Sequence, residues 1–353
     1  LIESLKPYGK TKKITIINSS GKLATNFNYY PCYLLFPAQY TINNSYNVDG
    51  FDDFSGQLSK HFCKYKLTIP DVQHFIDMFF CQYQSYTKLL KKIQPKIVFF
   101  FPIDYNMALI MAARELGIHT VDIQHGNMIG YNLPYNNWNE QPKDGYYLFP
   151  DTVFVWSERE KKHIYKTFNN VNAVTYGYPW LDKKNIEIKI QNKKLEKFCA
   201  KFKYIIIMSL SDHKFVPKII EEIAKNFRAE EMGIGFILKK NPKRAYTVIP
   251  KLENMYSDDI ITYESFFNLT KYANLHMTES SSCLYEADYV GLNTIVIGDN
   301  WKLHFKDLVE SERVFFVNSV DEFYNIFKKA VSFCHFPRLI DNKSNEFDDF
   351  MKK

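Results

Sequence analysis

Short apolar runs alternate with longer amphipathic segments along most of the chain, as strands and helices do in a parallel α/β fold. The clearest unit lies between residues 97 and 123 and consists of a strand, a helix and a strand at Ile97–Phe101, Asp104–Leu116 and Ile118–Ile123. Because such a connection crosses over the sheet, we expect the two strands to pair in parallel. A longer helix is predicted before this unit, from Val72 to about Lys92.

The same alternation continues in two series. The first ends with predicted strands at Thr152–Trp156 and Ala173–Tyr176, and the second has predicted strands at Tyr204–Met208, Gly235–Leu238, Ile260, Leu275–Met277, Thr294–Ile297 and Val314–Val317. Lysine-rich residues 183–203 lie between them. We therefore predict two Rossmann-like domains with parallel sheets, residues 1–182 and 183–353. Ile14–Ile17 is predicted as the first strand of the first domain, and the tail from Arg338 is expected to be loosely held.

Charge and composition narrow the classes of partner. The chain has 45 basic and 39 acidic residues and a net charge of +6. This is too mild for nucleic acid, but it suits anionic substrates or a weak attraction to a membrane surface. The six cysteines form no Cys-x-x-Cys pair, which predicts a reduced, cytoplasmic protein. No apolar run has the length of a membrane-spanning helix, and the start at Leu1 rather than Met raises the expectation of a longer parent chain.

The segment Thr278–Gly291 combines a strand end, three serines and a short helix. Ser280, Ser281 and Ser282 gather hydroxyls and backbone N–H groups at a predicted helix N-terminus, where a phosphate is favoured. Glu286 follows one turn later and is placed to accept hydrogen bonds from ribose hydroxyls. The alternative is an ordinary cap, with a first-turn glutamate that complements the helix dipole. In its context, we interpret this segment as half of a nucleotide-sugar site.

A second polar segment follows the strand at Ile118–Ile123. In an open parallel sheet, ligands bind in the loops after the carboxyl ends of the strands. His125 lies in such a loop, and a histidine there can take a proton from an acceptor hydroxyl near neutral pH. Asp104, Asp122 and Glu279 are the alternative bases. His125 as a simple brace of its loop remains the competing interpretation.

Basic residues follow the second strand of the second series. Lys239, Lys240 and Arg244, with Asn241 between them, suit a diphosphate, although a solvated basic turn explains them equally well. Ser209 ends the preceding strand and joins the predicted donor-binding residues. No His, Cys and Asp cluster has metal-ligand spacing, so we expect no catalytic metal and no other cofactor.

Several of these stretches together resemble a known class of enzymes. Gln124-His125-Gly126, the later Trp156-Ser157-Glu158 and Gly177–Asp182, and the serine segment with Glu286 are similar to bacterial capsule and surface-polysaccharide transferases of the GT-B fold. That class includes Kdo transferases, polysialyltransferases and CDP-glycerol glycerophosphotransferases. The resemblance covers roughly residues 97–299 and implies a site in which Gln124 and Gly126 also contact substrate. One departure is Asn241-Pro242, where several of these families have His-Pro.

The resemblance implies two Rossmann-like domains that face a central cleft, with the donor on the second domain. The expected reaction moves a sugar from a nucleotide sugar, with a CMP-linked acidic sugar slightly favoured, to a glycan or lipid-linked glycan. The product would be a capsule, O-antigen or lipooligosaccharide chain, made in the cytoplasm with a possible contact at the inner face of the membrane. The alternatives are transfer of a polyol phosphate from a CDP-linked donor, epimerisation of a sugar nucleotide, and a non-catalytic glycan-binding scaffold.

Overall fold

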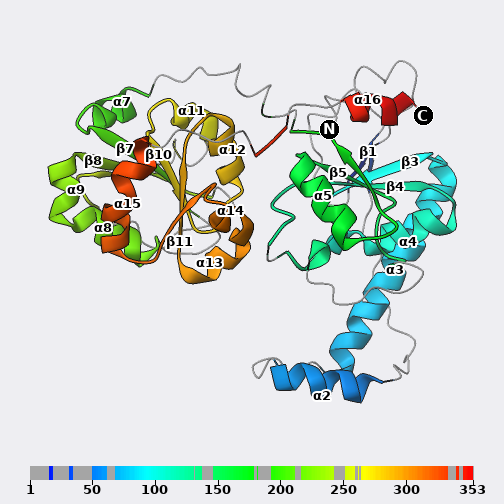
Figure 1. Cartoon of the computed structure of the whole chain (residues 1–353). Coiled ribbons are helices and arrows are strands. Elements are labelled where there is room, and N and C mark those ends of the chain that lie inside the picture. The colour runs from blue at the N-terminus through cyan, green and yellow to red at the C-terminus, as the bar shows by residue number, and fades with distance from the viewer. Residues whose placement is uncertain are drawn as a thin grey trace.

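The computed structural model describes residues 16–18, 32–34, 50–61, 68–130, 132–136, 146–178, 181, 192–210, 216–241, 251–258, 261, 264–332, 339–341 and 345–352. Most of these residues fold into two α/β lobes that lie side by side (Figure 1). Each lobe is built on its own parallel sheet.

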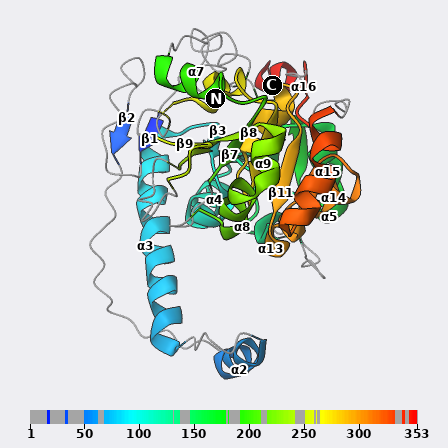
Figure 2. The ribbon, with the colours of Figure 1, turned by 90° about the vertical axis from the view of Figure 1, so that its left-hand side faces the viewer.

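The first lobe contains a four-stranded sheet in the order β3-β4-β5-β6. Its strands are β3 (Ile97–Phe100), β4 (His119–Ile123), β5 (Thr152–Val155) and β6 (Asn172–Thr175). Its other elements are α2 (Phe51–His61), α3 (Ile69–Ile93), η2 (Ile103–Tyr105), α4 (Met107–Glu115), η3 (Leu133–Tyr135) and α5 (Glu158–Thr167). Helix α2 and the start of α3 extend away from the sheet, as Figure 2 shows. Ser157 caps α5, because its hydroxyl accepts a hydrogen bond from the Arg159 N–H.

The second lobe contains a six-stranded sheet in the order β12-β11-β10-β7-β8-β9. Its strands are β7 (Tyr204–Ser209), β8 (Ile234–Lys239), β9 (Met255–Tyr256), β10 (Leu275–Thr278), β11 (Thr294–Ile297) and β12 (Phe315–Val317). Its helices are α7 (Lys193–Cys199), α8 (Lys218–Lys225), α9 (Phe227–Met232), α11 (Phe266–Thr270), α12 (Cys283–Tyr289), α13 (Asp299–His304), α14 (Lys306–Glu310) and α15 (Val320–Ser332). Every pairing in the sheet is parallel, as the alternation of strands and helices predicts.

Most predicted strands lie within two residues of the observed ones, apart from two predictions near the edges. The strand predicted at Ile260 lies outside the described residues, and the described edge strand before it, β9, ends at Tyr256. The strand predicted at Ile14–Ile17 corresponds to β1 (Ile16–Asn18). It pairs in parallel with β2 (Cys32–Leu34) in a separate two-stranded sheet and does not join the four-stranded sheet.

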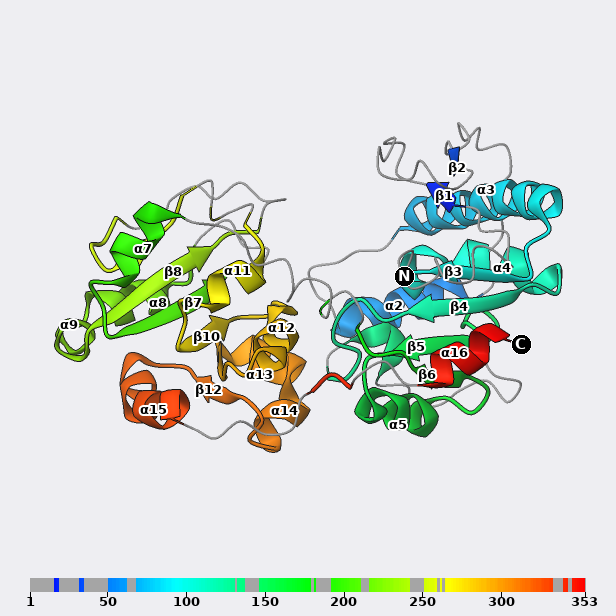
Figure 3. The same cartoon turned by 90° about the horizontal axis from the view of Figure 1, so that it is seen from above.

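The last helix, α16 (Asn345–Lys352), lies beside β5 and β6 of the first lobe (Figure 3). Phe347 is fully buried there, with its ring 5.6 Å from that of Phe154 and 4.8 Å from that of Tyr176. Glu346 accepts a hydrogen bond from the Thr175 N–H at 3.0 Å. The expectation of a loosely held tail is therefore wrong for these residues, because the amphipathic helix covers an apolar sheet face of the other lobe.

The described residues place α16 with the first lobe, although the sequence alone suggested that 183–353 forms one unit. Asp341, shortly before α16 in the chain, is bonded to the first lobe, because its N–H donates to the carbonyl of Trp156 at 3.0 Å. The Asp341 carboxylate in turn accepts from the Glu158 N–H at 2.7 Å, at the start of α5. The boundary at residue 182 stays a prediction, since residues 182–191 are not described.

We predict that Phe347→Ala destabilises the protein by about 3–5 kcal/mol, because it leaves a cavity between α16 and the sheet of the first lobe. Urea denaturation with a first-lobe probe would measure the change. Phe227→Ala is the matched control, because Phe227 is 64% exposed and its loss should change stability by at most about 0.5 kcal/mol. Equal effects of the two substitutions would contradict the packing role of α16.

Candidate functional site between the two lobes

The two lobes meet where the loop after β4 reaches α12. The hydroxyl of Tyr285 on α12 donates a hydrogen bond of 2.6 Å to Oδ1 of Asn127, two residues after His125. The side-chain amide of Asn127 donates to the carbonyl of His304 at 2.7 Å. Both Asn127 and Tyr285 are buried. The loop after β4 and the helix after β10 follow carboxyl ends of strands, so these ends of the two sheets lie toward each other.

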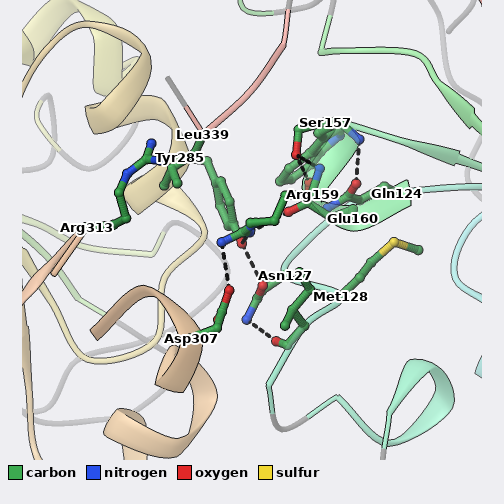
Figure 4. A network of polar contacts seen from close by, with 12 residues as sticks. Gln124, Asn127, Met128, Ser157, Arg159, Glu160, Tyr285, Asp307, Arg313 and Leu339 are labelled. Carbon is green, nitrogen blue, oxygen red and sulfur yellow. Dashed lines mark hydrogen bonds and ion pairs between the residues drawn. The ribbon is translucent and has the colours of Figure 1, made fainter. Parts of the chain in front are cut away.

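Arg159 completes this contact from the start of α5. Figure 4 shows its guanidinium between Tyr285, Asp307 and Glu160. It donates to Oδ2 of Asp307 at 2.9 Å, to Oε1 of Glu160 at 2.5 Å and to the Tyr285 hydroxyl at 3.1 Å. Burial alone would lower the pKa of Arg159, but the negative partners outweigh it and raise that pKa above its usual value. Glu160 is itself fully buried and accepts from the Ser157 hydroxyl.

A cluster of titratable groups lies beside this contact on the donor side predicted from the sequence. Burial raises the pKa of Glu286 to about 7, and the positive charge of Lys239 opposes that rise. Burial lowers the pKa of Lys239, and Cys283, Glu264 and Glu286 oppose that shift. Lys239, at the carboxyl end of β8, and Glu286 on α12 are therefore near enough to affect each other's pKa. Their role in a donor site stays a prediction.

Tyr178 of the first lobe belongs to the same cluster. Burial raises the pKa of Tyr178 to about 12, and the negative charge of Glu286 adds to the rise. The ring of Tyr178 also stacks on that of Trp156, with 4.6 Å between the centroids and 7° between the planes. The donor-side cluster is thus bordered by both lobes. The sequence analysis missed Tyr178 as a site residue, although Gly177-Tyr178-Pro179 is part of the resemblance.

The three serines next to this cluster differ in their hydrogen bonds and in their exposure. Ser281 accepts a hydrogen bond from the Cys283 N–H at 3.2 Å and so satisfies the first turn of α12. Ser282 makes no capping bond, contrary to the expectation, because its own backbone is already helical (φ −63°, ψ −8°), and its side chain is exposed. Ser280 and Glu279 are half-buried in the loop after β10. Gly291 ends the segment with φ +82°, as a glycine after a helix often does.

Ser209 lies inside the second sheet instead of at its surface. Its hydroxyl is 3.0 Å from Nε2 of His276, whose Nδ1 is 3.0 Å from the hydroxyl of Thr294. Complete burial lowers the pKa of His276 to about 3, so this imidazole is neutral. Ser209, His276 and Thr294 join three neighbouring strands. The sequence analysis missed this network, although a histidine within the apolar run Leu275–Met277 was the available signal.

On the first lobe, the residues around His125 also differ in their burial and in their hydrogen bonds. Gln124 is buried and braces the loop, because it accepts from the Trp156 N–H at 2.6 Å and donates to the Gly126 carbonyl at 3.0 Å. His125 is exposed, and its ring centroid lies 6.1 Å from that of Phe101. Partial burial lowers the pKa of His125, whereas the negative charge of Asp104 opposes that shift. The structure therefore brings together His125 and Asp104.

A buried carboxyl lies directly beneath this loop. Asp122 on β4 has no exposed surface, and it accepts a hydrogen bond from the Tyr135 hydroxyl. Its other oxygen, Oδ1, has no hydrogen-bond partner. Burial raises the pKa of Asp122 to about 7, against the opposing effect of the Tyr135 hydrogen bond. Asp122 cannot reach a substrate, so Asp104 is the better-placed carboxylate near His125.

The remaining predicted residues follow the carboxyl end of β8. Lys240 and Asn241 are half-buried just after β8, whereas Arg244 lies outside the described residues. Within the described part of the chain, no three His, Cys, Asp or Glu side chains gather as ligands for a metal ion. None of the helices described has the length and apolar character needed to cross a membrane.

Comparison with known proteins identifies the fold. No protein-family model and no curated protein sequence matches the chain. Among solved structures, it is similar to the glycotransferase of kitacinnamycin, with 10% identity over 92% of this chain and 84% of that chain and a TM-score of 0.58. It is also similar to a UDP-N-acetylglucosamine 2-epimerase (14% identity, 91% and 88% covered, TM-score 0.54) and to MurG of Acinetobacter baumannii (11%, 99% and 92%, TM-score 0.51). The predicted GT-B fold, with two Rossmann-like domains, is confirmed.

We predict that Asp122→Asn stabilises the protein relative to the wild type by an amount that grows from pH 4 to pH 7. In this window the unfolded Asp122 ionises, whereas burial keeps the folded one protonated, since its pKa is about 7. Wild-type stability therefore falls by at most about 1.4 kcal/mol per pH unit from this group, and asparagine lacks that loss.

Urea denaturation at several pH values would measure this difference. Asp321→Asn is the control, because the side chain of Asp321 is 79% exposed. Glu286 titrates in both proteins, so its contribution cancels in the comparison. A stability difference that does not vary with pH would show that Asp122 is ionised in the folded protein.

Proposed function

We propose that this protein is a glycosyltransferase that moves a sugar from a nucleotide-sugar donor to a hydroxyl of a bacterial surface glycan. The observation that carries the proposal is that Lys239, at the carboxyl end of β8, and Glu286 on α12 interact electrostatically on the second lobe. The hydrogen bond between Tyr285 and Asn127 joins α12 to the loop of the first lobe that contains His125. In an open parallel sheet, this edge is where ligands bind. The GT-B fold supports the reaction class by analogy.

In the proposed reaction, the donor nucleotide lies on the second lobe. The Glu286 carboxylate accepts hydrogen bonds from ribose hydroxyls, and the Lys239 ammonium faces the phosphate. The acceptor hydroxyl lies near His125, which takes its proton as the oxygen forms a bond to the anomeric carbon. The bond from that carbon to the phosphate oxygen breaks, and the nucleotide leaves with the electron pair. Lys239 stabilises the charge that develops on this phosphate, so the proposal needs no metal ion.

The surface near His125 suits a sugar acceptor. Phe101 and Tyr105 are 63% and 77% exposed on either side of Asp104. The side-chain amide of Asn106 donates to the carbonyls of Phe101 and Pro102, at 3.2 Å and 2.7 Å, and so holds this loop in place. Aromatic faces pack against the apolar C–H faces of sugars, while Asp104 can accept hydrogen bonds from their hydroxyls.

The finer assignments belong to the same proposal. We favour a CMP-linked acidic sugar as donor, and a capsule, O-antigen or lipooligosaccharide chain, free or lipid-linked, as acceptor. Work at the cytoplasmic face of the membrane would suit a lipid-linked acceptor. Two other reactions remain outcomes of the test. Transfer of a polyol phosphate from a CDP-linked donor would give a phosphodiester product, and epimerisation, which the likeness to the 2-epimerase favours, would need no acceptor. Saccharide binding without any nucleotide binding would instead indicate a glycan-binding scaffold.

The first test is nucleotide binding. Isothermal titration with CMP, CDP, UDP and GDP should show binding of at least one of them, and Glu286→Ala should weaken it by about 1.5–3 kcal/mol through loss of a charge-assisted hydrogen bond. Glu310→Ala is the matched control on an exposed helix, where the Glu310 side chain is 64% exposed. If none of the four nucleotides binds, the proposed function is wrong.

The second test concerns the base. His125→Ala should lower turnover by roughly a hundredfold or more and leave nucleotide affinity nearly unchanged, because His125 belongs to the opposite lobe. The acidic limb of the pH–rate profile should disappear, since it reports the imidazole. His74→Ala, on an exposed face of α3, serves as control. Wild-type turnover in the His125 variant would assign the proton to another group, such as Asp104 or Glu279.

A further inference from the structure

The phenol of Tyr285 occupies a position that the proposed reaction does not yet explain. It is completely buried, yet its hydroxyl is shared between the two lobes. The hydroxyl donates a hydrogen bond to Oδ1 of Asn127 at 2.6 Å and accepts one from Nη2 of Arg159 at 3.1 Å. Both partners belong to the first lobe, whereas Tyr285 lies on α12 of the second (Figure 4).

On the first lobe, Asn127 connects this hydroxyl to the loop that carries His125. Its amide donates to the carbonyls of Ile129 and His304, at 2.5 Å and 2.7 Å, so the loop is bound both to itself and to α13. At Gly130, where φ is +90°, a Cβ atom would overlap the carbonyl of His304. The loop therefore has no room to shift against the second lobe unless these contacts break.

On the second lobe, Tyr285 is the residue immediately before Glu286. Consecutive residues of a helix point in directions about 100° apart, so α12 presents Tyr285 to the first lobe and Glu286 to the donor-side cluster. Helix α12 has seven residues, and Tyr285 and Glu286 are neighbours in the middle of it. Any adjustment of α12 that accompanies contact with a nucleotide at Glu286 therefore acts on the Tyr285 hydroxyl, and through Asn127 on the loop of His125.

We propose that Tyr285 is a positioning residue that couples nucleotide binding at Glu286 to the placement of His125 in the opposite lobe. This inference rests on the proposed function. It assigns the coupling to one hydroxyl, because the ring of Tyr285 packs edge-on against Trp156, with 5.1 Å between the centroids, whether or not the hydroxyl is present. Tyr285→Phe therefore separates the hydrogen bonds from the packing.

The experiment observes His125 directly. Histidine labelled with ¹³C at Cε1 gives one NMR signal for each of the nine histidines, and His125→Gln identifies the signal of His125. The probes are CMP, CDP, UDP and GDP. In the wild type, the nucleotide that binds should shift the His125 signal. In Tyr285→Phe the same nucleotide should bind with an affinity within about threefold of wild type, while the His125 signal no longer responds. Turnover should fall by roughly tenfold or more, with little change in the donor KM.

The matched control is Tyr324→Phe. Tyr324 is also buried and donates a hydrogen bond of 2.7 Å, but to the carbonyl of Ile223 within the second lobe. This control should lower the melting temperature as Tyr285→Phe does, and yet keep the response of His125. Asn127→Ala removes the same bond from the loop side and should reproduce the effect if Tyr285→Phe does not fold.

The outcomes separate the two proposals. Absence of nucleotide binding to the wild type would overturn the proposed function and, with it, the coupling. Nucleotide binding with an unresponsive His125 signal in the wild type would overturn the coupling alone. A normal response in folded Tyr285→Phe, or in Asn127→Ala, would do the same and leave Tyr285 as a brace between the lobes.

Discussion

The structure depends on a buried hydrogen bond that joins its two halves, from the Tyr285 hydroxyl to Oδ1 of Asn127. A polar group without exposure must find a partner, because an unpaired one costs about 1–3 kcal/mol. Neither lobe supplies all the partners for its own groups at this contact. Tyr285 needs Asn127 and Arg159, and Arg159 needs Asp307 of the second lobe. The relative position of the lobes therefore follows from mutual satisfaction of buried groups, and not from apolar packing alone.

The same contact explains the character of the two half-sites. Two residues predicted to bind substrate are engaged within the protein instead. Gln124 braces the loop after β4, and Ser209 is bonded to His276 inside the second sheet. The residues with unusual electrostatics or exposure lie one position further on: His125 after Gln124, and Glu286 after Tyr285. In the loop after β4 and in helix α12, a residue with a structural role thus precedes the candidate site residue.

The sequence predicted the strands well because each central strand is a short, mainly apolar run, which a strand buried on both faces needs. It failed where the decisive contact lies far along the chain. The apolar residues of helix α16, among them Phe347 and Met351, indicate one buried face, but nothing nearby in the sequence shows that this face packs on Phe154, almost 200 residues away. Likewise, nothing near Tyr285 in the sequence indicates that its hydroxyl forms a hydrogen bond with the distant Asn127. The serine segment was placed correctly, but the backbone of Ser282 was not predictable from its residue type.

The return of α16 to the first lobe has a consequence for how the chain folds. The apolar face of β5 and β6 is completed by Phe347, which a ribosome delivers only after the whole second lobe has been synthesised. Domains generally fold in the order of their synthesis, but here the second lobe can finish its core while the first still has an uncovered sheet face. One face of the first sheet is therefore covered last, and its apolar surface stays exposed until α16 has been synthesised. A chaperone that binds such surfaces would meet this protein at the sheet of its first lobe.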